Sequence, residues 1–319
     1  MTAAARARRE RAAVAADDHG GVLSRRLLRE LGVDRNALAR EVAAGRWRRH
    51  GHETVAVHTV ALGDVARRWR AIWEVGAGAA VLDGVSALQA AGVTGFGEAV
   101  EHVSVPRAVH HGRVSGVRIH RIERGPRELA VAGIPRVRPA VAAIRAASWA
   151  VSDRQAALVL ALVVQQRVVT AGQLLAAASA VPVRSRRALI PLLAADVAAG
   201  AQSLGELDFA SLCRRHGLPV PDRQVVRTTP SGRIYLDVCW SDVGLVVEID
   251  GSSHRSGLAV MDDNLRQNAV VLDGGTVLRI DLVGLRLQPE AFMAQVCRAH
   301  AALGVSARGV VLTARKGAR

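Results

Sequence analysis

Two short apolar runs near the C-terminus contain acidic residues at positions typical of buried β-strands. The first run is Tyr235-Leu-Asp237, and the second, Gly244-Leu-Val-Val-Glu-Ile-Asp-Gly251, contains both Glu248 and Asp250. An unpaired carboxylate among Leu, Val and Ile side chains is costly, so these acids must be paired, protonated or bound to a cation. The pattern restricts this end of the chain to an α/β fold whose strands hold a polar group. The simpler alternative is that the acids only cap two strand ends.

Pairing of the two runs as a hairpin would gather three carboxylates and an imidazole. Asp237 and Glu248 would project from adjacent strands toward one point, and Asp250 and His254 follow closely in the chain. Oxygen ligands suit Mg²⁺ or Mn²⁺, and phosphodiester hydrolysis also needs a group that handles the proton of the attacking water. The spacing therefore predicts a divalent-cation site for cutting phosphodiesters.

Several motifs of the C-terminal third are shared with one group of proteins. They are Gly217-Leu-Pro219, Gln224, Tyr235-Leu-Asp237, Val247-Glu-Ile-Asp-Gly251 with His254, Asp262-Asp-Asn-Leu-Arg266 and Gly275-Thr-Val-Leu-Arg279. Through them, residues 214–303 resemble the restriction-endonuclease-fold proteins related to very-short-patch repair endonucleases, which are variants of the PD-(D/E)xK nucleases. The resemblance implies a mixed central sheet flanked by helices.

The same resemblance implies a ligand set for the metal. Asp237 and Glu248 would hold Mg²⁺ or Mn²⁺, and Asp250 would be a third ligand or would orient the following histidine. Glu206, eleven residues before Gly217, matches the place where such domains put a carboxylate near the metal.

The chain departs from the broader nuclease pattern at the position of the cation. The broader group has a lysine two residues after the Glu, where this chain has Asp250, and the single lysine of the sequence is Lys316. Catalysis would then need His254 or an arginine as the cation or proton carrier. The resemblance gives proton transfer to His254 and leaves Arg266 to hold phosphate.

The first sixty residues contain three helical patterns followed by a hairpin pattern. An Ala/Arg helix is expected over residues 3–16, Ser24 can cap a second helix, and Asp34 can cap a third. A tight turn between two short helices is the spacing of a helix-turn-helix. Residues 46–58 are typical of a winged β-hairpin with basic residues at its base.

The exposed polar residues of this segment suit the phosphates and base edges of double-stranded DNA. The candidate DNA-binding residues are Arg35, Asn36, Arg40, Arg46, Arg48 and Arg49. In the alternative interpretation, the helices form a protein interface.

The segment also resembles the winged-helix domain of abortive-infection type IV antitoxins. The shared motifs are Val22-Leu-Ser-Arg-Arg26, Leu31-Gly-Val33, Ala44-Gly-Arg-Trp-Arg-Arg49 and Val55-Ala-Val-His58. This resemblance implies a toxin gene as a possible neighbour.

Length and charge set the domain organisation. The 319 residues allow two or three domains, and the net charge of +15 points to polyanions as partners. We expect a winged helix-turn-helix domain over residues 1–60, a mixed α/β and helical connecting domain over residues 61–200, and a restriction-endonuclease-like domain with a flexible basic tail over residues 201–319. These parts carry +5, +8 and +2, so the candidate nuclease domain is the least basic.

Two classes of protein are excluded by the residue pattern. The longest wholly apolar run, Ala156 to Val164, is less than half of the ~20 residues that a membrane span needs, so a cytoplasmic protein without membrane partners is expected. The three cysteines are odd in number and widely spaced, which favours neither a disulfide framework nor a zinc motif.

The sequence thus favours a metal-dependent DNA endonuclease or nickase, or a protein derived from one, directed to DNA by a winged helix. The alternative is a non-enzymatic DNA-binding regulator that uses an inactive nuclease fold, similar to an antitoxin that represses its own gene. Charge alone leaves RNA processing open as a third class.

Overall fold

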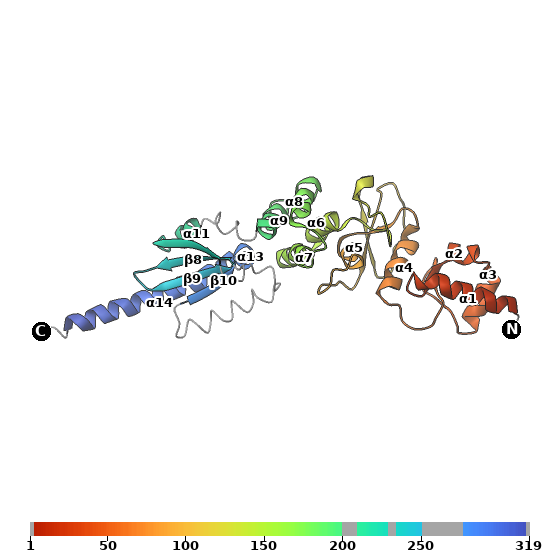
Figure 1. The fold of residues 1–319 in the computed structure, drawn as a ribbon, viewed down its shortest axis with the longest axis horizontal. Coiled ribbons are helices and arrows are strands. Elements are labelled where there is room, and N and C mark those ends of the chain that lie inside the picture. Colours follow the sequence, from red (N-terminus) through yellow and green to blue (C-terminus); the bar gives the residue numbers. More distant parts are fainter. Residues whose placement is uncertain (1–2, 200–208, 229–233, 251–276, 317–319) are drawn as a thin grey trace. The chain divides into compact units, whose positions relative to one another are not determined.

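The computed structural model describes residues 3–199, 209–228, 234–250 and 277–316, and the protein is a mixed α/β chain (Figure 1). It divides into two compact units, Met1–Ala146 and Ala147–Arg319. The division into three domains at residues 60 and 200 stays a prediction. Among the described residues, no helix has the length and apolar character that crossing a membrane requires.

The first unit begins with three helices and a small antiparallel sheet. The sheet has the strand order β1-β3-β2, with Val55 of β3 paired to both Leu23 and Arg49. The order of elements along the chain is α1 (Ala3–Asp17), β1 (Val22–Ser24), α2 (Arg25–Glu30), α3 (Arg35–Ala43), β2 (Arg48–Arg49) and β3 (Thr54–Ala56).

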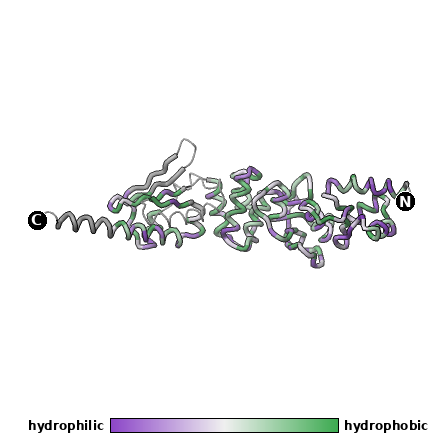
Figure 2. The backbone as a smooth tube through the Cα atoms, turned by 90° about the horizontal axis from the view of Figure 1, so that it is seen from below, coloured by the Kyte–Doolittle hydropathy of each residue, from purple (hydrophilic) through white to green (hydrophobic). Residues whose placement is uncertain are grey.

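Both predicted helix caps of this segment are confirmed. The Ser24 side chain accepts a hydrogen bond from the backbone N–H of Leu27 at 3.1 Å, and Asp34 accepts one from Ala37 at 2.6 Å. These bonds satisfy N–H groups that the first turn of a helix leaves unpaired. The three helices then close over a common apolar core with Trp47 and Val55. Figure 2 shows hydrophilic and hydrophobic residues interspersed along the N-terminal helix.

The remainder of the first unit is built around a second small sheet, of order β4-β5-β6. Strand β4 is antiparallel to β5, and β5 is parallel to β6. The elements are α4 (Asp64–Gly76), β4 (Val81–Leu82), α5 (Gly84–Ala90), β5 (Glu101–Val105), β6 (Val117–Arg121), the short helix η1 (Pro126–Glu128) and α6 (Pro139–Trp149).

A single carboxylate joins the β2–β3 hairpin to helix α4. Glu74 accepts hydrogen bonds at 2.8 Å from the backbone N–H groups of His52, Glu53 and Thr54, and a fourth at 2.8 Å from the Thr54 hydroxyl. A Cβ atom on Gly51 would collide with this carboxylate, and Gly51 has a φ of 150°, which favours glycine. The hairpin loop is therefore shaped around the side chain of Glu74.

The second unit opens with α7 (Asp153–Gln165), α8 (Ala171–Ala180) and α9 (Leu189–Ala199). The helices agree with the helical part of the expected connecting domain, and Arg186, in the loop before α9, has a φ of 56°. Arg186 also donates from Nε to Asp153 at 2.6 Å, which ties the loop before α9 to the start of α7.

The C-terminal part of this unit is a mixed four-stranded sheet packed against helices. The strand order is β10-β9-β8-β7; β8 is antiparallel to β7 and β9, whereas β9 and β10 are parallel. The elements are α11 (Phe209–Arg215), β7 (Arg223–Thr228), β8 (Ile234–Trp240), β9 (Leu245–Asp250), β10 (Val277–Asp281), α13 (Leu282–Leu287) and α14 (Pro289–Lys316).

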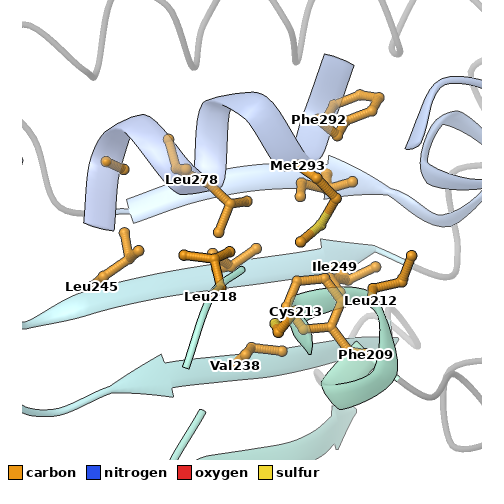
Figure 3. Packing of buried hydrophobic residues seen from close by; sticks show 14 of the residues in the cluster. Phe209, Leu212, Cys213, Leu218, Val238, Leu245, Ile249, Leu278, Phe292 and Met293 are labelled. Carbon is orange, nitrogen blue, oxygen red and sulfur yellow. The ribbon is translucent and has the colours of Figure 1, made fainter. Parts of the chain in front are cut away.

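The core of this domain joins the sheet to α11 and α14. Figure 3 shows side chains of both helices and of β8, β9 and β10 in one apolar cluster. Phe209 of α11 and Phe292 of α14 are fully buried in it. Helix α14 continues as far as Lys316, through most of the part that was expected to form the flexible basic tail. The segment has no proline that would end a helix.

We predict that replacing Glu74 by Ala lowers the free energy of unfolding by roughly 1–3 kcal/mol, because several donors lose a charged acceptor. Chemical denaturation followed by circular dichroism measures the change. Glu53→Ala is the matched control, since it removes the same charge and keeps the Glu53 backbone N–H. Equal stabilities of the two variants would contradict an anchoring role.

Candidate functional site

The alternation of side chains in β9 decides which of its residues can reach a ligand. Leu245, Val247 and Ile249 are buried in the core, whereas the side chain of Glu248 keeps 33% of its surface exposed. Successive residues of a strand point to opposite faces. Glu248 is therefore on the face of the sheet turned away from the apolar cluster.

The predicted hairpin is confirmed, with the two expected acids directly opposed. Asp237 of β8 pairs with Glu248 of β9, and Arg279 of β10 pairs with Glu248 from the other side. Directly opposed positions of neighbouring strands share a face. Positions 237, 248 and 279 thus form one row across three strands.

Arg279 is a site residue that the sequence interpretation did not single out. Its Nε lies 3.3 Å from Oε2 of Glu248, and its side chain is 64% exposed. The positive guanidinium offsets the charge of the carboxylate. The motif that ends at Arg279 was visible in the sequence, but its parallel pairing with β9 was not.

Several predicted site residues cannot be placed. Glu206, His254 and Arg266 lie outside the described residues, as do the side chains of Asp237 and Asp250. Within the described part of the chain, no group of three or more His, Cys, Asp and Glu side chains could hold a metal ion. The predicted ligand set is therefore neither assembled nor excluded by the described side chains.

Two of the predicted DNA-binding arginines line one pocket in the N-terminal segment. The pocket has a volume of about 390 Å³, and Arg35 of α3 and Arg49 of β2 line it together with Arg25 and Arg29 of α2. The sequence interpretation had placed the DNA contacts on α3 and the hairpin only. The two arginines of α2 were missed because the packing of α2 beside the hairpin is a tertiary feature.

Arg46 belongs to a different surface. It pairs with the buried Glu41 at 2.6 Å and lines a second pocket, together with Arg6 and Arg9 of α1. The remaining predicted DNA-binding residues are exposed and line neither pocket. These are Asn36, Arg40 and Arg48.

A histidine pair in the second half of the first unit, the buried His102 and the half-buried His120, is a further polar cluster. His102 Nε2 lies 3.0 Å from Oε2 of Glu98, and His120 Nε2 lies 3.2 Å from Nδ1 of His102. Burial lowers the pKa of both rings, and it takes that of His120 to about 3, with the charges of His102 and Arg118 contributing. The rings are neutral at physiological pH, so they link β5 to β6 through one hydrogen bond between uncharged imidazoles.

No family model matches the chain, and no curated protein matches it either.

The histidine pair makes the stability of the protein depend on pH. Because the folded pKa of His120 lies below its unfolded value of about 6.5, the unfolded state binds more protons between the two values. Stability is then complete above about pH 6.5 and falls as the pH drops toward 3, by up to ~1.4 kcal/mol per pH unit.

Thermal melting between pH 7.5 and pH 4.5 measures this loss for the wild type and for His120→Gln. The variant should lose less stability over that range, whereas His110→Gln, which changes an exposed histidine, should follow the wild type. Parallel pH profiles for all three proteins would show that His120 does not carry the effect.

Proposed function

We propose that the protein is a Mg²⁺- or Mn²⁺-dependent DNA endonuclease or nickase that a winged helix directs to double-stranded DNA. The observation that carries the proposal is the register of β8 and β9, which sets Asp237 directly opposite Glu248. Like charges that lie directly opposite each other on neighbouring strands destabilise a sheet. A cation bound by both acids would remove this repulsion.

The arrangement of the second unit supports a restriction-endonuclease-like domain. A mixed four-stranded sheet with α11 and α14 against it is the architecture that this resemblance implies. The acids are on the strands β8 and β9, at the centre of that sheet, where a rigid framework would hold them.

The donor set suits a hard divalent cation. Glu248 offers a partly exposed carboxylate in the row with Asp237, and Asp250 and Glu206 are the further proposed oxygen ligands. Such an ion, when bound, neutralises charge on the phosphate and acidifies a water molecule.

The protein's own side chains would handle the proton and the substrate. His254 is proposed to accept the proton of the attacking water, and Arg266 to hold the phosphate. Arg279 of β10, exposed beside Glu248, offers a second guanidinium for the substrate.

The N-terminal elements support a winged helix that binds DNA. The three helices, the antiparallel sheet of order β1-β3-β2 and the short β2–β3 hairpin match the expected arrangement. Arg35, Asn36 and Arg40 are exposed on α3, and Arg48 and Arg49 are exposed on β2. These side chains are available to phosphates and base edges.

One observation favours the non-enzymatic regulator as a second candidate. The ion pair between Arg279 and Glu248 gives this carboxylate a partner other than a metal. A regulator would retain such a pair to hold β9 and β10 together, and it would bind DNA without cutting it.

Cleavage of supercoiled plasmid in the presence of Mg²⁺ or Mn²⁺ separates the two candidates. The wild type should produce nicked or linear DNA, and Glu248→Gln should lower the rate by ~10²-fold or more, because the variant loses a charged metal ligand of similar shape. DNA that is bound by the wild type but left intact with either metal would favour the regulator.

The metal site has a test that does not depend on cleavage. Mg²⁺ at 100 times its dissociation constant should raise the free energy of unfolding by about 2.7 kcal/mol by mass action. Asp237→Asn should abolish this rise in a thermal melt, while Asp242→Asn, in the exposed turn between β8 and β9, should retain it. Equal stabilisation of both variants would place the cation elsewhere.

A further inference from the structure

The pocket between α2, α3 and the β2–β3 hairpin has the lining that a phosphate ester requires. Arg25 and Arg29 come from α2, Arg35 from the start of α3, and Arg49 from β2. Four arginines from three elements thus line a space of about 390 Å³. Guanidinium groups bind phosphate oxygens through paired N–H donors.

Two carboxylates that line the pocket reduce its net positive charge, and so favour a ligand of low negative charge. Asp34 and Glu53 also line it, so its formal charge is +2. The hydrogen bond from the Ala37 backbone N–H lowers the pKa of Asp34. The Asp34 carboxylate is therefore ionised, and it already accepts the hydrogen bond that caps α3. A singly charged phosphodiester group suits a pocket with this net charge.

Most of the pocket lining is polar, and three apolar residues form a small floor. Leu28, Val33 and Leu38 line it and are buried in the core of the N-terminal segment. Inorganic phosphate has no surface to place against such a floor, whereas the C–H faces of a deoxyribose do. The combination of arginines and apolar floor matches a sugar joined to a phosphate.

Arg25 supplies an independent sign of a ligand. Its Nε is buried and has no hydrogen-bond partner among the described residues, although its backbone N–H donates to Glu53 at 2.8 Å. A buried donor without a partner is destabilising, so a movement of the Arg25 side chain toward a ligand oxygen in the pocket would relieve that cost.

We infer that this pocket binds one sugar–phosphate unit of the backbone of double-stranded DNA. The inference rests on the proposed DNA-directed function and adds to it a contact from α2, on Arg25 and Arg29. Contacts to the backbone carry no sequence information, so the pocket anchors the protein on any duplex. A preference for a particular DNA sequence would come from exposed residues of α3, such as Asn36 and Arg40, that can reach base edges.

The test compares neighbouring arginines of α2 in the full-length protein. Arg25→Gln and Arg29→Gln each remove one lining charge. Arg26→Gln is the matched control, because Arg26 is 80% exposed, pairs with Glu30 at 2.9 Å and does not line the pocket. Binding of two fluorescent duplexes of unrelated sequence is measured at several salt concentrations.

We expect each lining variant to reduce the slope of log K against log salt by about 0.9 and to weaken binding of both duplexes by the same factor. Arg26→Gln should bind like the wild type. Thermal melts check that the variants fold, and Arg29→Gln keeps the test valid if Arg25→Gln does not, since Arg29 is exposed.

The failures can be told apart. A wild type that binds neither duplex overturns the proposed DNA-directed function. A wild type that binds, with lining variants equal to Arg26→Gln, overturns the pocket alone. If inorganic phosphate stabilises the wild type but not Arg25→Gln, and DNA binding is unchanged, the pocket is a site for free anions and the sugar–phosphate assignment is wrong.

Discussion

The burial of alternate side chains in β9 is the constraint on which the second unit depends. Leu245, Val247 and Ile249 face the core with α11 and α14, and a shift of one residue in register would exchange them for Glu248. Such a shift would turn two carboxylates, those of Glu248 and Asp250, toward the core and expose three large apolar groups. The register that satisfies the core is thus the same one that aligns positions 237, 248 and 279.

In the first unit, the Glu74 carboxylate has a comparable role. It satisfies three backbone N–H groups of the β2–β3 hairpin, while Arg70, one turn earlier in α4, donates to the backbone carbonyl of His50 at 2.5 Å. A two-residue strand such as β2 gains little stability from its own pairing. Helix α4 therefore holds the hairpin that carries Arg49. This residue forms one wall of the arginine pocket, which is the pocket lined by Arg25, Arg29, Arg35 and Arg49.

The proposed functions of the two units call for different kinds of surface. The arginine pocket combines cations with an apolar floor and suits a backbone that is held without being altered. The row across the sheet combines carboxylates with one arginine, which suits an ion and a phosphate whose charge changes during a reaction. A protein that brings a cutting site to duplex DNA needs both.

The sequence by itself determined the helix caps at Ser24 and Asp34, the β8–β9 hairpin and the opposition of Asp237 to Glu248. These features are local, because capping residues and alternating apolar residues act within a few positions. Only the tertiary structure decided that Arg279 pairs with Glu248 and that α2 joins the arginine pocket, since both depend on elements far apart in the chain. A parallel strand pair and the packing of a helix beside a hairpin leave no periodic pattern in the sequence, so their partners are fixed by the shared core alone.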